Sequence, residues 1–335
     1  MPRHSGRAAA IDERRFHRWL ATHLPAGATG LLPLGDDAAA LRPPPGRVAV
    51  LTTDAFVEGV HFRSASPPER VGAAVVAVSL SDLAAKGAAP AAILLALLLP
   101  RGTPESWAAA VVRGAERESA RYGASVVGGD TKPAPRPIVV GFGLGWARAG
   151  RLAPRTGARS GDLVVTTGEI GRGGLAADRL ARAGPRGAAT PLAELLEVRP
   201  RLAEGRTLVR WAHAMLDTSD GLAEAAHLLA EASRLRVVLE EEALPYAPGF
   251  DRLGLRGARK RAVAFYGGDY ELLFALAPRD LDRARRAVRG VGGRISPIGR
   301  LERGRGAVLL VGGRTRPLPR SGWQPFRSVR LPVRA

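Results

Sequence analysis

Short apolar runs that lead into carboxylate and hydroxyl side chains are the features that most constrain this chain. The first run, at 48–51, is Val-Ala-Val-Leu, and Thr52, Thr53 and Asp54 follow it. We expect the run to form a strand with the polar residues at its end. A hard cation such as Mg²⁺ prefers oxygen ligands and reaches protein through a few carboxylates together with substrate phosphates. The alternative is an ordinary exit from a strand into a turn, where Thr and Asp are common.

Five other segments place acidic residues beside glycine or hydroxyl residues. Neighbouring carboxylates repel each other unless a cation or solvent intervenes, and glycine lets the backbone approach a phosphate closely. Each segment alone also has a structural explanation, such as a solvated turn or a helix cap formed by Ser219 or Asp220. The segments are Gly-Asp-Asp at 35–37, Ser-Leu-Ser-Asp at 79–82, Gly-Gly-Asp-Thr at 128–131, Asp-Thr-Ser-Asp-Gly at 217–221 and Gly-Gly-Asp-Tyr-Glu at 267–271.

Hydrophobic periodicity predicts helices and strands that alternate irregularly, which favours an α+β domain over strict βαβ winding. A segment rich in Arg, Gly and Pro at 147–161 has the composition of a connection between domains. We therefore predict two domains, 1–147 and 148–335. The Gly-rich turn at 168–174, after an apolar run, is a candidate phosphate cradle at a helix N-terminus. Helices are expected at 11–24, 66–87 and 104–121, and strands at 91–99, 123–127, 138–146, 162–167 and 272–276.

Composition narrows the possible functions. The chain has a formal charge of +19, yet its basic residues are scattered and almost all are Arg, the lysines being Lys86, Lys132 and Lys260. Aromatic residues make up 5% of the chain, so few rings can stack on bases. No run approaches the roughly 20 apolar residues of a membrane span, and the N-terminus lacks a signal pattern. Cysteine is absent, which excludes thiolate metal sites. We predict a cytoplasmic protein with no nucleic-acid partner and no membrane partner.

Taken in order, the motifs resemble those of the thiamine-monophosphate kinase family, within the superfamily that includes aminoimidazole ribonucleotide synthetase. The resemblance covers nearly the whole chain and implies an α+β / α/β, two-domain aminoimidazole ribonucleotide synthetase-like architecture. It also implies a homodimer in which the N-terminal sheets form a barrel-like core. The matching motifs are GDD at 35–37, TTDAFVEGVHF at 52–62, SLSDLAAKGA at 79–88, GGDT at 128–131, DTSDGL at 217–222, GGDYEL at 267–272 and GWxxF at 322–326.

The resemblance implies ATP-dependent phosphorylation of thiamine monophosphate to thiamine diphosphate, with residues 1–147 binding ATP and Mg²⁺ and residues 148–335 completing the phosphate and substrate site. A phosphate oxygen would attack the γ-phosphate of ATP directly, which requires positioning and charge neutralisation more than a base. The implied Mg²⁺ ligands are Asp37, Thr52, Thr53, Asp54, Asp82, Asp130, Asp217 and Asp220, of which Asp54, Asp82, Asp130 and Asp220 would be catalytic. Gly129, Arg155 and Ser219 would contact ATP, and His61, Gly268, Trp323 and Phe326 would contact the thiamine substrate.

Three positions depart from the family pattern. Ser79 replaces an Asn, Arg172-Gly173 replaces Asp-Ser, and Gly268 replaces an acidic residue expected beside the substrate. Two alternatives therefore stay open: another ATP-using enzyme of the same superfamily, and a catalytically weak ATP-binding dimer with a regulatory role. A complete set of clustered aspartates argues against the second alternative, because such clusters are electrostatically unfavourable without a function. The absence of cysteine argues against the superfamily branches that use cysteine chemistry.

Overall fold

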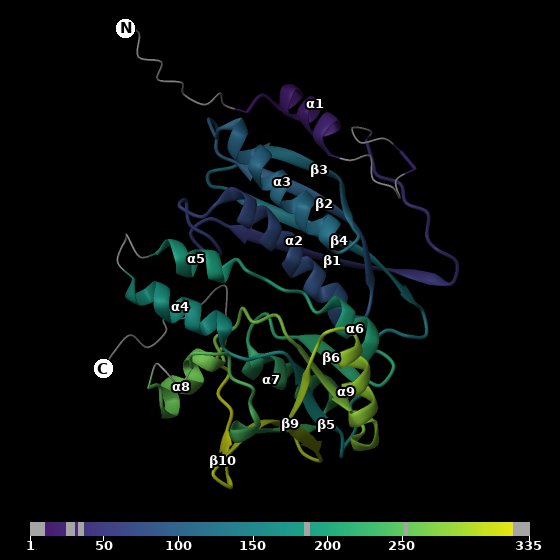
Figure 1. Cartoon of the computed structure of the whole chain (residues 1–335), viewed down its shortest axis with the longest axis vertical. Helices are drawn as coiled ribbons and strands as arrows, with labels where there is room; N and C mark the ends of the chain where they lie inside the picture. Colours follow the sequence, from purple (N-terminus) through teal and green to yellow (C-terminus); the bar gives the residue numbers. More distant parts are fainter. Residues whose placement is uncertain (1–10, 25–30, 33–36, 184–187, 251–253, 324–335) are drawn as a thin grey trace. The chain divides into compact units, whose positions relative to one another are not determined.

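The computed structural model describes residues 11–24, 31–32, 37–183, 188–250 and 254–323 (Figure 1). The chain forms two compact units. Unit 1 comprises residues 1–45, 51–79 and 90–146, and unit 2 comprises residues 46–50, 80–89 and 147–335. Helix α2 (Pro68–Ala85) belongs to unit 1 up to Ser79 and to unit 2 from Leu80 onward.

Unit 1 is built on a four-stranded sheet with two helices packed on it. The strands are β1 (Arg47–Val57), β2 (Ala89–Leu99), β3 (Ser125–Pro133) and β4 (Ile138–Arg148), in the order β1-β4-β2-β3. Strands β2 and β3 run parallel and are connected by helix α3 (Glu105–Arg121). Helix α1 (Glu13–His23) begins at Asp12, whose carboxylate accepts a hydrogen bond from the Arg15 backbone N–H at 2.8 Å and so caps the helix.

Glycine allows α2 and α3 to approach each other at backbone distance. A Cβ placed on Gly72 would lie 1.9 Å from the carbonyl oxygen of Val111, and one on Gly114 would lie 2.0 Å from that of Glu69. Helix α2 also packs on the sheet, where the hydroxyl of Ser79 donates to the carbonyl oxygen of Gly141 at 3.4 Å. Only glycine fits at the helix crossing, because any side chain there would collide with the opposite backbone.

Two polar motifs of unit 1, at 52–54 and 128–131, lie within strands, whereas the sequence placed them at strand ends. Strand β1 continues through Thr52, Thr53 and Asp54, since Thr is a good strand former and alternation persists across the motif. The Gly-Gly-Asp-Thr motif lies inside β3, paired with β2. The close approach that Gly129 permits is to the neighbouring strand: a Cβ there would lie 1.9 Å from the carbonyl oxygen of Leu95.

Unit 2 contains a seven-stranded mixed sheet in the order β11-β10-β7-β9-β5-β8-β6. Strands β10 and β7 are parallel, and every other neighbouring pair is antiparallel. Helix α7 packs into the core, where Leu222 and Leu229 lie against Leu216 and Val237. The strands are β5 (Leu163–Thr167), β6 (Ala214–Asp217), β7 (Arg236–Glu240), β8 (Leu272–Leu276), β9 (Ile295–Glu302), β10 (Gly306–Val311) and β11 (Arg314–Pro317), and the helices are α4 (Arg172–Arg182), α5 (Ala189–Leu195), α6 (Leu202–Leu208), α7 (Leu222–Ser233), α8 (Gly257–Ala264) and α9 (Leu281–Gly290).

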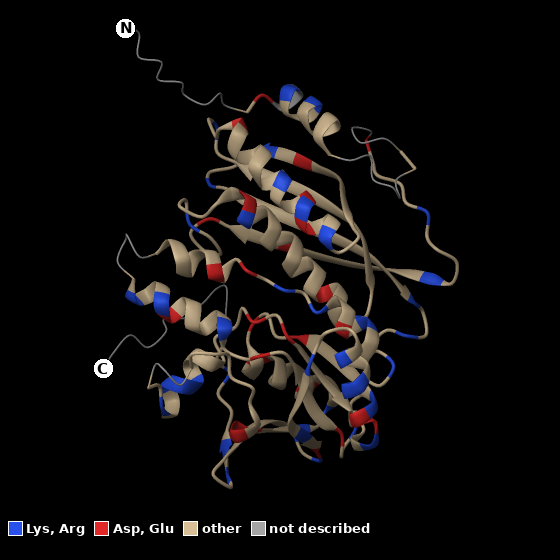
Figure 2. Ribbon diagram, viewed as in Figure 1, with Lys and Arg blue, Asp and Glu red and all other residues tan. Residues whose placement is uncertain are grey.

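Two units of mixed sheet and helix agree with the predicted fold class, and neither sheet closes on itself within the described residues. Figure 2 shows Lys and Arg distributed along the elements of both units. This distribution matches the scatter of basic residues in the sequence, and the absence of a nucleic-acid partner stays a prediction. None of the helices in the described part of the chain is long and apolar enough to cross a membrane.

Candidate active site

A buried carboxylate at the end of β6 is the centre of the candidate site in unit 2. Asp217 is 9% exposed, and both of its oxygens accept hydrogen bonds from hydroxyl groups. Ser81 Oγ donates to Oδ2 at 2.8 Å, and Ser219 Oγ donates to Oδ1 at 2.9 Å. Helix α2 contributes Ser81, whereas Ser219 belongs to the turn after β6. The two polar motifs, 136 residues apart at Ser81 and Asp217, therefore meet at one carboxylate.

Repulsion between carboxylates characterises this part of unit 2. Burial and the charge of Asp82 raise the pKa of Asp217 to about 6, although the two serine hydroxyls oppose the rise. Burial also raises the pKa of Asp220, followed by the charge of Glu224. We call Asp82, Asp217 and Asp220 the acidic site. Its charges are unfavourable together, and a bound cation would relieve their repulsion.

Two cationic side chains of unit 2 interact with the acidic site. Lys86 donates from Nζ to the carbonyl oxygens of Ala153 at 3.1 Å and Met215 at 2.9 Å. Burial, followed by the charge of Arg155, lowers the pKa of Lys86 to about 8, although the charges of Asp217 and Asp82 oppose the shift. Arg155 is exposed and interacts electrostatically with both Lys86 and Asp220. An exposed guanidinium beside carboxylates suits the recognition of phosphate oxygens.

A glycine turn and the segment before Trp323 pack around the turn that follows β6. The Gly268 N–H donates to the carbonyl oxygen of Ser219 at 2.8 Å, and the Trp323 N–H donates to that of Asp220 at 3.1 Å. Gly268 has φ +77°, in the left-handed region that glycine adopts readily. The structure therefore brings four of the predicted site residues of unit 2 together through their backbones. Phe326, the remaining predicted substrate contact of this region, lies outside the described residues.

The predicted ligands of unit 1 lie on two strands and one loop. Thr53 on β1 donates from Oγ1 to the carbonyl oxygen of Gly141 at 3.1 Å, and Asp54 is half-buried on the same strand. Asp130 on β3 is exposed, and the Lys132 ammonium lies 2.7 Å from its Oδ1. This hydrogen bond to Lys132 lowers the pKa of Asp130 below its ordinary range. Thr52 is half-buried on β1, Gly129 precedes Asp130 on β3, and Asp37 is exposed in the loop before β1.

His61 is held in one orientation by its own turn. The Val57 N–H donates to Nδ1 of His61 at 3.2 Å, and the imidazole stacks on Phe56 with 5.2 Å between ring centroids. Burial lowers the pKa of His61. A neutral ring whose Nδ1 accepts a hydrogen bond carries its proton on Nε2, so His61 can offer a donor to a substrate.

The Gly-rich turn predicted as a phosphate cradle is already occupied by the side-chain carboxyl group of Asp269. Its Oδ2 accepts from the Gly171 N–H at 2.7 Å and its Oδ1 from the Gly173 N–H at 2.9 Å. These groups stand at the N-terminus of α4, where a carboxylate satisfies unpaired donors and complements the helix dipole. Burial raises the pKa of Asp269 to about 7, and the two backbone donors oppose that rise. The turn therefore binds a side chain where the sequence predicted a phosphate.

The buried Glu271 forms an ion pair with the half-buried Arg201, which the sequence did not indicate. Glu271 is 3% exposed, and its Oε2 accepts from Thr167 Oγ1 at 2.6 Å and from Arg201 Nε at 2.7 Å. A second bond from Arg201 reaches Oε1, which makes the pair bidentate. Thr167 also accepts from the Leu272 N–H at 2.8 Å. Nothing around Arg201 marks it as special in a chain with so many arginines.

The alternative explanation of the Asp-Thr-Ser-Asp-Gly motif, a helix cap formed by Ser219 or Asp220, does not hold in the structure. Helix α7 begins at Leu222 after Gly221, which has φ +100°, and no side chain caps it. The hydroxyl of Ser219 donates to Asp217 instead. A Cβ on Gly221 would lie 2.2 Å from the carbonyl oxygen of Phe265, so this turn requires glycine. The side chain of Ser219 therefore contacts Asp217 of the acidic site and does not cap α7.

The donor chemistry of the predicted ligands fits a hard cation. Among the described residues, no group of three or more His, Asp or Glu side chains is placed to hold a metal ion by itself. Mg²⁺ usually binds through one or two carboxylates with waters and substrate phosphates completing the shell. The buried Asp217, repelled by Asp82 and supplied with hydroxyls, offers the oxygen-only donors that such an ion prefers.

Comparisons with known proteins match both units. Two family models match the chain. The model for the N-terminal domain of AIR synthase related proteins matches residues 35–147, and the model for their C-terminal domain matches residues 159–312. A thiamine-monophosphate kinase of Synechococcus elongatus is 36% identical over 299 residues, covering 82% of this chain and 88% of that protein. The corresponding kinase of Halobacterium salinarum is 38% identical over 267 residues, covering 80% of this chain and 87% of that protein.

Solved structures of thiamine-monophosphate kinases also superpose on this chain. The thiamine-monophosphate kinase of Stenotrophomonas maltophilia superposes with a TM-score of 0.76 at 29% identity, covering 90% of this chain and 97% of that chain. The structure of AaThiL complexed with AMPPCP and TMP superposes with a TM-score of 0.71 at 26% identity, covering 92% of this chain and 94% of that chain. The predicted aminoimidazole ribonucleotide synthetase-like fold is therefore confirmed.

The substitution Asp217→Asn should stabilise the metal-free protein at neutral pH. The folded pKa of Asp217 is raised from 3.8 to about 6, so its stabilising contribution is complete below about pH 4 and is lost as pH rises through 6. A rise of that size corresponds to roughly 3 kcal/mol. With a chelator present, we expect the variant to melt a few degrees above the wild type at pH 7.5, with a smaller difference at pH 4.5.

Thermal melting across this pH range measures the effect. The control is Asp282→Asn, whose side chain is 77% exposed and which should melt like the wild type throughout. A stability difference that is the same at both pH values would contradict the assignment of a desolvated, repelled carboxylate at this position.

Proposed function

The chain belongs to the thiamine-monophosphate kinase family, and we propose that it transfers the γ-phosphate of ATP to thiamine monophosphate, forming thiamine diphosphate and ADP. The observation that carries this proposal is the match to kinases of this name over both units. The structure of AaThiL with AMPPCP, an analogue of ATP, and TMP supports both substrates. The aspartates proposed as Mg²⁺ ligands, Asp37, Asp54, Asp82, Asp130, Asp217 and Asp220, are also all present in this chain.

Phosphoryl transfer to a phosphate acceptor sets simple requirements for the protein. An oxygen of the thiamine monophosphate bonds to the γ-phosphorus as the bond to the ADP oxygen breaks. The acceptor oxygen is already ionised at neutral pH, so positioning and charge neutralisation are the main tasks. We assign His61 a hydrogen bond from Nε2 to the substrate, since its Nδ1 already accepts from Val57 and its pKa is lowered.

We propose Mg²⁺ as the cofactor, where it would neutralise charge on the phosphates. The proposed ligands remain those implied by the family motifs: Asp37, Thr52, Thr53, Asp54, Asp82, Asp130, Asp217 and Asp220. The electrostatic repulsion within the acidic site supports this assignment. Arg155 and Ser219 are proposed to contact ATP together with Gly129, and Gly268, Trp323 and Phe326 to contact the thiamine moiety.

Roles for the two parts of the chain follow the same assignment. We propose that residues 1–147 bind ATP and Mg²⁺ and form the dimer, and that residues 148–335 complete the phosphate and substrate site. Ser81 and Asp82 belong to unit 2 although they lie in the N-terminal part of the sequence. The proposed site therefore draws its unit 2 ligands from both parts of the chain. A cytoplasmic location stays a prediction of the sequence.

The direct test is incubation of the purified protein with ATP, Mg²⁺ and thiamine monophosphate, with thiamine diphosphate measured by chromatography. We expect formation of thiamine diphosphate by the wild type and a loss of roughly a hundredfold or more in turnover for Asp54→Ala, Asp82→Ala and Asp130→Ala, because each removes charge-organising oxygens. Asp282→Ala, which removes an exposed carboxylate, serves as the control and should retain full activity.

Other outcomes distinguish the alternatives. ATP consumption without thiamine diphosphate would favour a different enzyme of the superfamily. Binding of ATP with no turnover of any kind would favour a regulatory dimer. Activity near that of the wild type in any one of the three aspartate variants would reject that residue as a catalytic group.

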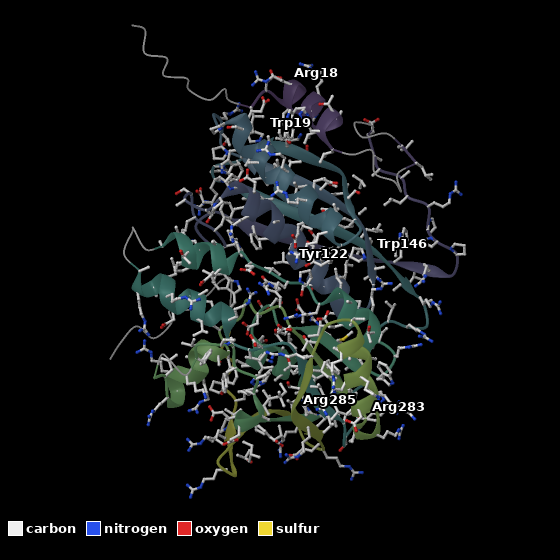
Figure 3. All side chains as sticks on the ribbon, viewed as in Figure 1. Arg18, Trp19, Tyr122, Trp146, Arg283 and Arg285 are labelled. Carbon is white, nitrogen blue, oxygen red and sulfur yellow. The ribbon has the colours of Figure 1, made fainter. Side chains whose placement is uncertain are left out.

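An apolar sheet face of unit 1 supports the proposed homodimer. Along β4, alternate residues Val139, Gly141, Gly143 and Gly145 are buried, while the residues between them are half-buried. These half-buried positions are Val140, Phe142, Leu144 and Trp146, the last labelled in Figure 3. Strand β2 repeats the pattern, with Leu94 at 37% exposure between buried neighbours. A contiguous, partly exposed apolar face on a sheet is typical of a protein interface.

We propose that a second copy of the chain covers this face and that the paired sheets form a barrel-like core. Light scattering at micromolar concentration should therefore give twice the chain mass of 35.2 kDa. Phe142→Arg should shift the protein towards monomer, since burying an unpaired charge at an interface is unfavourable. Leu152→Arg changes a leucine that is 41% exposed in unit 2 and should leave the mass unchanged. A wild-type monomer would refute the dimer.

The glycine at position 268 should weaken substrate binding relative to an acidic residue. A carboxylate beside the cationic thiamine ring would contribute on the order of 1 kcal/mol, or several-fold in affinity. Because this contact exists in the ground state and the transition state alike, Gly268→Glu should lower KM for thiamine monophosphate several-fold and leave kcat nearly unchanged. Both kinetics and thermal melting should be measured.

Gly268→Ala is the matched control for the backbone. Position 268 has φ +77°, so any side chain there costs roughly 1–2 kcal/mol, and both variants should melt below the wild type by a similar amount. A Cβ at this position meets only Gly173 Cα at 3.6 Å, so steric conflict adds little. Equal KM values for the Glu and Ala variants would show that charge at this position does not contact the substrate.

A further inference from the structure

The ammonium group of Lys86 joins three segments of unit 2. Lys86 directly follows the last residue of α2. Its Nζ donates to the carbonyl oxygen of Ala153, in the segment between β4 and β5, and to that of Met215 in β6. The backbone beneath it is fixed: Gly87 has φ +68°, and a Cβ there would lie 2.1 Å from Cγ1 of Val209. Lys86 therefore projects from a rigid base to two carbonyl oxygens on separate segments.

Each joined segment carries a residue of the proposed site close to the point of attachment. Asp82 lies one helical turn before Lys86 on α2. Arg155 and Asp217 each lie two residues after a carbonyl oxygen that accepts from Nζ. A small displacement of either carbonyl would thus move a phosphate-contacting cation or a buried carboxylate. No sequence motif predicted this link.

The use of lysine at this position is itself unusual for the chain. Among 50 basic residues, only Lys86, Lys132 and Lys260 are lysines. An ammonium is compact and carries three rotatable donors, whereas a guanidinium is a larger planar group whose donors are fixed in a fork. Burial and the charge of Arg155 lower the pKa of Lys86, and the carboxylates of Asp217 and Asp82 raise it. The ammonium charge of Lys86 is therefore desolvated, and it interacts electrostatically with two carboxylates of the acidic site.

We propose that Lys86 is a positioning residue that holds Asp82, Arg155 and Asp217 in register for binding of a magnesium–nucleotide complex. This inference rests on the proposed function for its kinetic consequences only. The structural part of the proposal is that Lys86 fixes the acidic site through two carbonyl oxygens. This part does not depend on which substrate the protein uses.

A different role would be purely electrostatic, with Lys86 acting as a counter-charge to the carboxylates. The two roles predict opposite results for the removal of the charge. A counter-charge competes with a metal cation, so its loss should tighten Mg²⁺ binding. A positioning group organises the ligands, so its loss should weaken binding, as substitutions behind metal ligands typically do by 10- to 100-fold.

The experiment compares Lys86→Met and Lys86→Arg with the wild type, using calorimetric titration with Mg²⁺ and AMPPCP in the absence of thiamine monophosphate. We expect roughly tenfold weaker binding for Met. We also expect weaker binding for Arg, because the larger head group displaces the carbonyl oxygens. In the kinase assay, KM for the magnesium–nucleotide complex should rise and kcat should fall less. Tighter binding in Met together with wild-type binding in Arg would overturn the proposal in favour of a counter-charge.

Two further measurements make the test independent of activity. Lys260→Met is the matched control, since Lys260 lies over the Tyr246 ring, 3.9 Å from its centroid, and should bind Mg²⁺ and AMPPCP like the wild type. In metal-free protein at pH 7.5, Lys86→Met and Asp217→Asn should be non-additive in Tm by a few degrees, as groups in one network are. Additive effects would overturn the positioning role even if no nucleotide bound, whereas absent turnover with intact coupling would reject only the proposed function.

Discussion

Burial of the Asp217 carboxylate beside Asp82 is the constraint on which the organisation of unit 2 depends. Desolvation and repulsion both disfavour the charged form, and two serine hydroxyls offset only part of that penalty. Lys86 donates to the Met215 carbonyl oxygen in the strand that carries this carboxylate and interacts electrostatically with Asp217 and Asp82. The same unfavourable charge would give a cation bound there a large stabilising effect, since a ligand that binds only the folded state adds to its stability. The burial and repulsion of the Asp217 carboxylate therefore both destabilise the metal-free protein and favour the binding of a cation.

The acidic motif Gly-Gly-Asp-Tyr-Glu at 267–271 has a different, structural role. Asp269 occupies the N-terminus of α4, and Glu271 is held by Arg201 and Thr167. Both carboxylates are only 3% exposed, and each is satisfied by several donors. Removal of Arg201 alone would leave a buried charge without its partner, which is far more unfavourable than loss of an exposed ion pair. These acids shape the turn at 267–270 that packs on the acidic site, so their contribution to function is through structure.

Sequence patterns predicted most helices and strands, but they predicted only some of the contacts that the polar residues make. The helices at α2 and α3 and the strands β2, β5 and β8 follow from periodicity, because burial repeats with the period of each element. The sequence could not show that Thr52–Asp54 and Gly128–Thr131 lie within strands, since strand length depends on pairing with distant partners such as β2. It could not show that Asp269 fills the turn at 168–174, about a hundred residues away. Arg201 and Lys86 were also beyond prediction, because their partners are backbone or buried groups brought together only by folding.

The division of labour within one motif explains how substrate preference can change without loss of the fold. Residues 267, 269 and 271 are buried, whereas Gly268 and Tyr270 between them are half-buried. The buried members fix the turn: Asp269 through two backbone N–H groups and Glu271 through a bidentate pair. Tyr270 keeps φ +54° despite its side chain, which shows that the anchors on either side outweigh the strain of the left-handed conformation. Position 268 contributes a backbone hydrogen bond to Ser219 and no side-chain anchor, so an acid there would change the charge near the substrate at the cost of a strained φ. The electrostatics of substrate binding can therefore vary at 268 while the turn, α4 and the acidic site stay in place.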